Sequence, residues 1–158
     1  MMGEAAGCCS RGARAAITRK GIIGIARSWI GTPYHHQASA KGVGTDCLGL
    51  LRGICREVYG REPQKVPHYP YDWSTKKSDE ALITAASCHF DTLPFEQMGG
   101  GDILIFRLRR GAAAQHLGIA VEGNRLIHAV ERYGCVEVPL SEAWRRRMSA
   151  VFAFRGIK

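Results

Sequence analysis

The stretch "TDCLGLLRGICREVYG", residues 45–60, decides the fold because it predicts a long amphipathic helix that begins at a cysteine. Its apolar residues recur at helical spacing and cover one broad face of that helix. Asp46 is suited to cap the N-terminus, and Gly60 stands where helices commonly end in a left-handed residue. Cys47 therefore falls in the first turn of the predicted helix.

Cys47 has two interpretations at this place. Unpaired backbone N–H groups and the helix dipole favour a thiolate at a helix N-terminus, which suits a nucleophile. An isolated cysteine on an apolar helical face is also a common packing residue. The six cysteines of the chain show no spacing typical of a zinc site, so we expect reduced thiols and neither a metal nor another cofactor.

The second half of the chain changes from helical to strand-like patterning. Short apolar runs separated by glycines predict about five antiparallel strands, and these lie at residues 102–108, 116–122, 125–130, 135–140 and 150–155. Further helices are predicted at about 18–30 and 79–90, and Ser141 is suited to cap a short one. Helices first and strands second predict an α+β domain, with the helix of Cys47 packed on the sheet.

Two histidines in neighbouring predicted strands are candidate partners for the thiol. His116 begins one strand and His128 lies in the next. A two-residue turn between these strands would send the histidines to opposite faces of the sheet. A three-residue loop, 122–124, would pair Val121 with Arg125 and make the histidines diagonal neighbours on one face. We expect the loop of odd length.

Length and composition indicate one globular domain. A chain of 158 residues with 46% hydrophobic and 23% charged residues fits a single domain, which we place at 17–158 after a disordered lead at 1–16. No stretch is apolar enough for a membrane span or for an ordinary secretory signal, so we expect synthesis in the cytoplasm without a signal peptide. The net charge of +8 favours polyanionic surfaces, but without a recognition motif we expect no specific nucleic-acid partner.

Five motifs in this order resemble the NlpC/p60 family of cell-wall cysteine peptidases. They are "GTPY" (31–34), "TDCLGL" (45–50), "GGGDILIF" (99–106), "HLGIAV" (116–121) and "LIHAV" (126–130). The resemblance implies a papain-like α+β fold. It implies Cys47 as nucleophile, His116 as general base and then acid, and His128 as the polar residue that orients His116. Tyr34, with the backbone N–H of Cys47, would stabilise the oxyanion.

The sequence departs from the family pattern on one side of the expected cleft. Many family members have Ser after the cysteine, beside the free amine of the substrate, where this chain has Leu48. Substrate recognition at Leu48 is therefore open, and Asp46 either holds a substrate amine or only caps the helix. His35, His36 and Gln37 replace the usual glycines after the tyrosine, and we expect these two histidines to be exposed to solvent.

The resemblance implies a peptidoglycan hydrolase that cleaves an amide of the stem peptide, next to D-glutamate or diaminopimelate. "GTDCLGL" and "REVYG" resemble the peptidases of phage tails and gene transfer agents, which implies tail-hub proteins as partners and action in the periplasm or cell wall from within a particle. Three alternatives stay open: a structural tail-hub protein with a vestigial site, an amidase or acyltransferase on the same fold, and a nucleic-acid-binding module.

Overall fold

The computed structural model describes residues 16–69 and 80–158, and the predicted lead therefore lies almost entirely outside the described residues. The elements along the chain are α1 (Arg19–Ser28), β1 (Ser39–Ala40), β2 (Gly44–Thr45), α2 (Cys47–Tyr59), α3 (Ala81–His89), β3 (Asp91–Leu93), the 3-10 helix η2 (Phe95–Gln97), β4 (Ile103–Phe106), β5 (His116–Val121), β6 (Arg125–Val130), β7 (Gly134–Pro139), α4 (Glu142–Arg147) and β8 (Met148–Ala153). The predicted order of helices and strands is confirmed.

The helix α2 begins and ends where the sequence predicts. The side chain of Asp46 accepts a hydrogen bond from the backbone N–H of Gly49, and Gly60 ends the helix with φ of 74° in the left-handed region. Its apolar face carries Leu50 and Ile54, which are fully buried. This helix is therefore fixed at both ends and along one face.

The sheet has six strands in the order β3-β8-β4-β5-β6-β7, and every neighbouring pair is antiparallel. Five of the strands match the predicted runs, whereas β3 at one edge was not predicted. Between α1 and α2 the chain also forms a small two-stranded sheet, in which Ser39 pairs with Thr45 and Ala40 with Gly44. The fold class is α+β, as expected.

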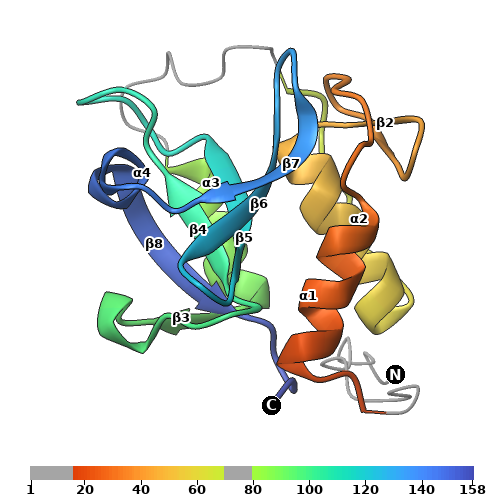
Figure 1. Cartoon of the computed structure of the whole chain (residues 1–158), viewed down its shortest axis with the longest axis horizontal. Helices are drawn as coiled ribbons and strands as arrows, with labels where there is room; N and C mark the ends of the chain where they lie inside the picture. The colour runs from red at the N-terminus through yellow and green to blue at the C-terminus, as the bar shows by residue number, and fades with distance from the viewer. Residues whose placement is uncertain (1–15, 70–79) are drawn as a thin grey trace, which may run out of the picture.

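The helices are divided between the two faces of the sheet (Figure 1). α1 and α2 pack on each other and on β5, and α2 also contacts β6. Close packing of the two helices depends on Gly53, because a β-carbon there would lie 1.9 Å from the ring of Trp29. α4 lies on the opposite face, where Trp144 packs against a smaller apolar cluster that includes Phe106 and Leu126.

The beginning and the end of the described chain meet beside the sheet. The backbone N–H of Arg19 donates to the carbonyl of Lys158 at 3.2 Å. The guanidinium of Arg19 forms a 2.7 Å ion pair with Asp102, which is almost fully buried and precedes β4. α1 is thereby tied to the centre of the sheet. Among the described residues, no helix is long and apolar enough to cross a membrane.

Candidate active site

The N-terminus of α2 is held by the carboxylate of Asp46. Its Oδ1 accepts the N–H of Gly49 at 2.7 Å, and its Oδ2 accepts the N–H of Gln37 at 2.7 Å and the hydroxyl of Tyr69. Asp46 is 2% exposed. The carboxylate thus joins three segments around Cys47, which agrees with its predicted role as a helix cap.

The glycine of the "TDCLGL" motif allows the chain to pass over this helix end. A β-carbon on Gly49 would lie 1.9 Å from the carbonyl oxygen of Ala38. That same carbonyl accepts the backbone N–H of Asp46 at 3.3 Å. Only glycine at position 49 therefore permits the segment that carries Tyr34 and Gln37 to lie against the start of α2.

The thiol of Cys47 lies beside the residue that precedes the start of β5. Its Sγ donates to the carbonyl oxygen of Gln115 at 3.8 Å, one residue before His116. Burial, and then the neighbouring carboxylate of Asp46, raise the pKa of Cys47 to about 12, while backbone hydrogen bonds from Leu117, Leu48 and Cys47 lower it. In the free protein, burial therefore opposes the thiolate that the helix N-terminus favours.

The two histidines form a hydrogen-bonded pair. The loop 122–124 has three residues, Val121 pairs with Arg125, and the histidines lie on one face, so the predicted register is confirmed. His116 Nε2 and His128 Nδ1 are 2.8 Å apart, and the residues are 7% and 3% exposed. Burial, with the charge of His128 as a second cause, lowers the pKa of His116 to about 3, and burial lowers the pKa of His128 to about 4. Both rings are therefore neutral at neutral pH.

The hydrogen bond decides which nitrogen of His116 remains for the thiol. Because Nε2 faces His128, Nδ1 is the nitrogen that can accept a proton. A basic Nδ1 requires the proton of the neutral ring on Nε2, which then donates to His128 Nδ1. His128 can thus select the tautomer of His116 in which Nδ1 is a base.

The indole of Trp144, which is not among the predicted site residues, lies against both histidine rings. The ring of Trp144 is stacked on His116, with centroids 5.5 Å apart and 28° between the planes, and it meets His128 edge-on at 5.1 Å. In the sequence, this residue is a lone aromatic in the charged run "SEAWRRR". The signal that could have identified Trp144 was a single aromatic residue in a short, otherwise polar helix.

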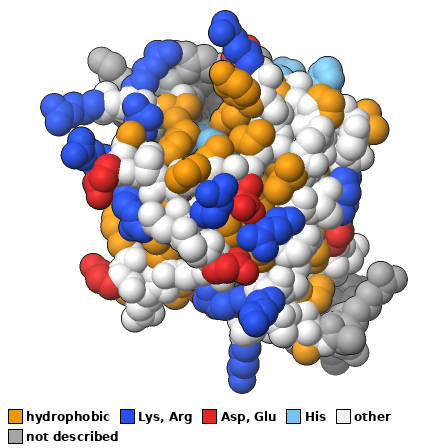
Figure 2. All heavy atoms as spheres, in the orientation of Figure 1, with side chains coloured by type: hydrophobic (Ala, Val, Ile, Leu, Met, Phe, Trp, Pro, Cys, Tyr) orange, Lys and Arg blue, Asp and Glu red, His pale blue; other side chains and the backbone are white. Residues whose placement is uncertain are grey.

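Cys47 and His116 open on one cleft with a free volume of about 360 Å³. In Figure 2 hydrophobic side chains border a hollow in which a histidine side chain is visible. The cleft is lined by Tyr34, His36, Asp46, Cys47, Leu48, Tyr69, Leu108, Arg109, Gln115, His116, Ala129, Val130, Glu131 and Trp144. The structure therefore brings together five of the six predicted site residues on the cleft wall, with His128 behind His116.

His36 differs from its predicted exposure. Its Nε2 lies 3.0 Å from the carbonyl oxygen of Tyr69, and its ring meets the ring of Tyr69 at 85°. The residue is half-buried on the cleft wall, whereas His35 is exposed as expected. The difference arises because Gln37 has φ of 65°, a turn that carries its N–H to Asp46 and turns the preceding residue inward.

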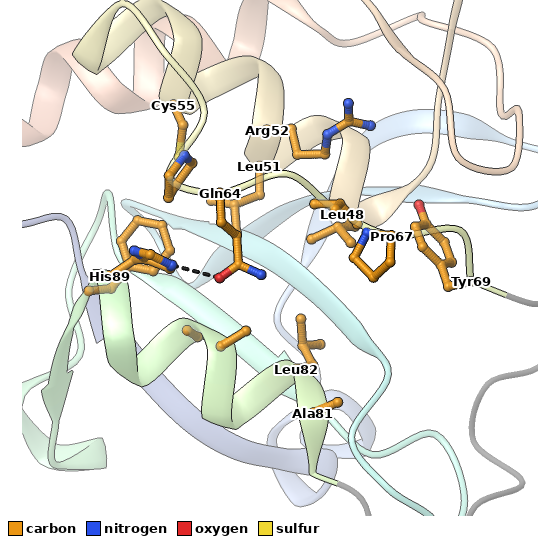
Figure 3. A pocket seen from close by; sticks show the side chains of 15 residues that line it. Leu48, Leu51, Arg52, Cys55, Gln64, Pro67, Tyr69, Ala81, Leu82 and His89 are labelled. Carbon is orange, nitrogen blue, oxygen red and sulfur yellow. Dashed lines mark hydrogen bonds between the residues drawn. The ribbon is translucent and has the colours of Figure 1, made fainter. Parts of the chain in front are cut away.

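A second, largely apolar pocket of about 270 Å³ adjoins the cleft (Figure 3). It lies between α2, residues 63–69 and α3, and Leu48 and Tyr69 line both cavities. On its far side His89 Nε2 lies 2.7 Å from Gln64 Oε1. Leu48 is thus part of the wall that separates the cleft from an apolar space.

The described cysteines and acidic residues form no further obvious centre. Cys47, Cys55, Cys88 and Cys135 are free thiols. Within residues 16–69 and 80–158, no group of three or more His, Cys, Asp or Glu side chains is arranged to hold a metal ion.

Comparison with known proteins gives one family. A model described as "NlpC/P60 family" matches residues 31–152. The murein DD-endopeptidase MepS/murein LD-carboxypeptidase of Escherichia coli (strain K12) is 26% identical over 120 residues, which are 75% of this chain and 54% of that protein. The chain thus spans about half the length of the curated relatives it matches.

Solved structures of this family share the fold. The NlpC/p60 domain of the peptidoglycan hydrolase SagA superposes with a TM-score of 0.61 at 20% identity, over 87% of this chain and 100% of that one. NlpC2 from Trichomonas vaginalis gives a TM-score of 0.63 at 16% identity, over 89% of this chain and 48% of that one. The expected papain-like α+β architecture is confirmed.

Proposed function

This chain belongs to the NlpC/P60 family, and we propose that it is a peptidoglycan hydrolase acting as a cysteine endopeptidase on an amide bond of the stem peptide, next to D-glutamate or diaminopimelate. One observation carries the proposal: a thiol at a helix start opens on the same cleft as His116, whose ring is hydrogen-bonded to that of His128. The likeness to a murein endopeptidase over three quarters of the chain supports the substrate class.

In the proposed reaction, a neutral thiol and a neutral imidazole react together. His116 Nδ1 takes the proton of Cys47 as Sγ attacks the substrate carbonyl, and the imidazolium then protonates the leaving amine. His116 next takes a proton from water, which attacks the thioester and releases the acid and the free thiol. His128 holds His116 in the required tautomer and stabilises the imidazolium through the Nε2–H hydrogen bond.

The negative charge that forms on the substrate carbonyl needs donors near the sulfur. The backbone N–H of Cys47, in the first turn of α2, and the hydroxyl of Tyr34 on the cleft wall are proposed for this role. On the other side of the sulfur, Leu48 presents an apolar side chain to the substrate. The carboxylate of Asp46 already accepts three hydrogen bonds, which favours its role as a cap over binding of a substrate amine.

Digestion of purified sacculi tests the proposal. We expect the wild-type chain to release soluble muropeptides, and mass spectrometry of the new ends to identify the cleaved amide. Cys47→Ala is expected to abolish release, and Cys88→Ala, which removes an exposed thiol on α3, is expected to leave it unchanged. Release by Cys47→Ala at the wild-type rate would refute the assignment.

The same experiment separates the alternatives. Transfer of the acyl group to an added amine in place of water would indicate an acyltransferase, and loss of the link between muramic acid and the first stem residue would indicate an amidase. A particle role is proposed from the resemblance of "GTDCLGL" and "REVYG" to tail-associated peptidases. It predicts that this chain copurifies with tail-hub proteins, and that Cys47→Ala particles assemble but deliver DNA less efficiently.

A further inference from the structure

The helix α4 packs on the rest of the protein through one partly buried side chain, that of Trp144. Of its six residues, Glu142–Arg147, all but Trp144 are exposed, and Trp144 packs against the apolar cluster on its face of the sheet. A helix this short is not stable by itself. The packing of α4 therefore depends on where the indole of Trp144 is held.

The indole contacts both members of the histidine pair and one aromatic residue beneath them. It is stacked on His116, edge-on to His128, and edge-on to Phe106 with centroids 5.1 Å apart and 66° between planes. Trp144 also lines the cleft. It thus lies on the cleft wall with its ring against both imidazoles.

The loop that sets the register of the histidines also anchors α4. Asn124, which has φ of 59° in the three-residue loop, accepts the N–H of Leu140 through its backbone at 2.9 Å and donates its side-chain amide to the carbonyl of Leu140 at 3.3 Å. Its side-chain oxygen accepts a hydrogen bond from Arg145. On the other side, the N–H of Arg107 donates to the carbonyl of Arg147 at 2.8 Å. The helix is held from both sides above the pair.

We propose that Trp144 is a positioning residue for the His116–His128 pair: its indole fixes the orientation of the His116 ring and keeps water from the hydrogen bond between the two rings. Stacking restricts rotation of the imidazole, and an apolar cover strengthens a hydrogen bond beneath it because water no longer competes. The same cover disfavours the charged form of both rings, which agrees with their buried, neutral state.

Few charged groups face the pair from the surrounding elements. Asp46 and the titratable thiol of Cys47 approach from α2, Arg109 from the loop before β5, and Glu131 from the turn after β6. From α4, the guanidinium of Arg147 lies over the ring of Trp144, 5.8 Å from its centroid. Tyr34, His36 and Tyr69 are the other titratable groups among the described residues on the cleft wall. Among the described residues that line the cleft, Trp144 is in ring contact with both imidazoles, and His116 itself lines the cleft.

Titration of the histidine ring nitrogens by NMR tests the proposal without any assay of activity. The wild-type chain, labelled with ¹⁵N in its histidine rings, is compared with Trp144→Ala and Trp144→Phe. Leu140→Ala is the matched control, because Leu140 belongs to the same apolar cluster but has no ring contact with the pair. Melting temperatures are recorded for all four proteins.

We expect the two wild-type rings to remain neutral down to about pH 5. In Trp144→Ala, their titration midpoints should rise by at least about one pH unit, because water reaches the pair. Trp144→Phe should keep most of the wild-type behaviour, and Leu140→Ala should melt at a lower temperature with unchanged midpoints. Unchanged midpoints in Trp144→Ala, or an equal rise in Leu140→Ala, would overturn the proposal.

Kinetics on a soluble muropeptide add a second readout, which rests on the proposed function. Trp144→Ala is expected to lose a few-fold in kcat at pH 4.5, where its rings begin to be protonated, and much less at pH 8, with KM nearly constant. A rise in KM alone, with unchanged histidine midpoints, would instead assign Trp144 to direct substrate contact and contradict the proposal. If the chain shows no peptidase activity, the NMR titration still decides the role of Trp144.

Discussion

Gly118 of β5 lies against His128 of β6: a β-carbon at position 118 would be 3.0 Å from the Cβ of His128 and 2.7 Å from the carbonyl oxygen of Ile127. Such contacts are too short, so β6 can lie this close to β5 only because position 118 has no side chain. The diagonal approach of His116 and His128 therefore depends on the glycine of "HLGIAV".

We predict that Gly118→Ala separates the histidines. The added methyl group also meets Leu126 at 2.5 Å, so the strands must shift, and the expected loss in the free energy of unfolding is about 1–3 kcal/mol. The rate of hydrolysis of sacculi should fall by a larger factor than the smaller folded fraction of the variant accounts for. Gly24→Ala on α1, where a β-carbon meets nothing within 4 Å, is the control: it should raise the free energy of unfolding by about 0.5–1 kcal/mol and leave hydrolysis nearly unchanged. Wild-type hydrolysis in Gly118→Ala would contradict the geometric argument.

Replacement of Asp46 should destabilise the chain more than loss of an ordinary helix cap. Asp46→Ala removes the acceptor for the N–H groups of Gly49 and Gln37 and for the hydroxyl of Tyr69, so we expect a loss of about 2–4 kcal/mol in urea unfolding. Thr18→Ala removes the exposed cap of α1, which accepts one N–H at 3.1 Å, and should cost about 1 kcal/mol. Equal losses in the two variants would show that the additional bonds of Asp46 contribute nothing.

The stability of the chain should fall in mild acid because the histidine pair is buried in its neutral form. The pKa values of about 3 and 4 lie below the value of 6.5 in the unfolded chain, so the unfolded state binds more protons below pH 6.5. Above that pH the pair contributes no pH dependence. From pH 7 to pH 5 the free energy of unfolding should decrease by about 4 kcal/mol.

The variants that test this dependence replace the histidines by glutamine. His116→Gln with His128→Gln should flatten the decrease between pH 7 and pH 5, and His35→Gln, at an exposed position, should not. Urea unfolding at several pH values measures the slope. An equally steep decrease in the double variant would assign the acid sensitivity to other groups.

Alkylation should show that Cys47 is not activated in the free protein. With the pKa raised to about 12, Cys47 should react with iodoacetamide at neutral pH on the order of 100-fold more slowly than an ordinary thiol, because the smaller thiolate fraction outweighs its greater nucleophilicity. Exposed Cys88 provides the internal comparison. Mass spectrometry of the labelled peptides measures both rates, and faster labelling of Cys47 at pH 7 would show that the helix N-terminus prevails over burial.

The sequence predicted local structure well because α2 and the strands depend on periodicity and on turn chemistry. The caps at Asp46 and Gly60 and the three-residue loop before β6 are determined within a few residues of chain. β3 was not predicted, since it is a short strand whose first two residues, Asp91 and Thr92, are exposed and which forms by pairing with β8. Edge strands of this kind depend on the partner more than on their own sequence.

The parts of the site that were missed depend on distant segments. The hydroxyl of Tyr69 reaches Asp46 across 23 residues, and Trp144 reaches His128 across 16. The burial that raises the pKa of Cys47 could not be read from the sequence either, because a sequence shows the helix end but not how much protein surrounds the sulfur. The candidate residues could be named from motifs, whereas their environment required the fold.

The two faces of the sheet have separate apolar clusters. Ile103, Ile119 and Ile127 point to α1 and α2, whereas Phe106, Leu126 and Trp144 belong to the cluster beside the imidazoles. The larger cluster also supports Cys47, Tyr34 and Leu48, so a protein engineer who repacks it for heat resistance also changes the support of the thiol. Substitutions that change only the pH dependence of the imidazoles should be sought in the smaller cluster, beside Trp144.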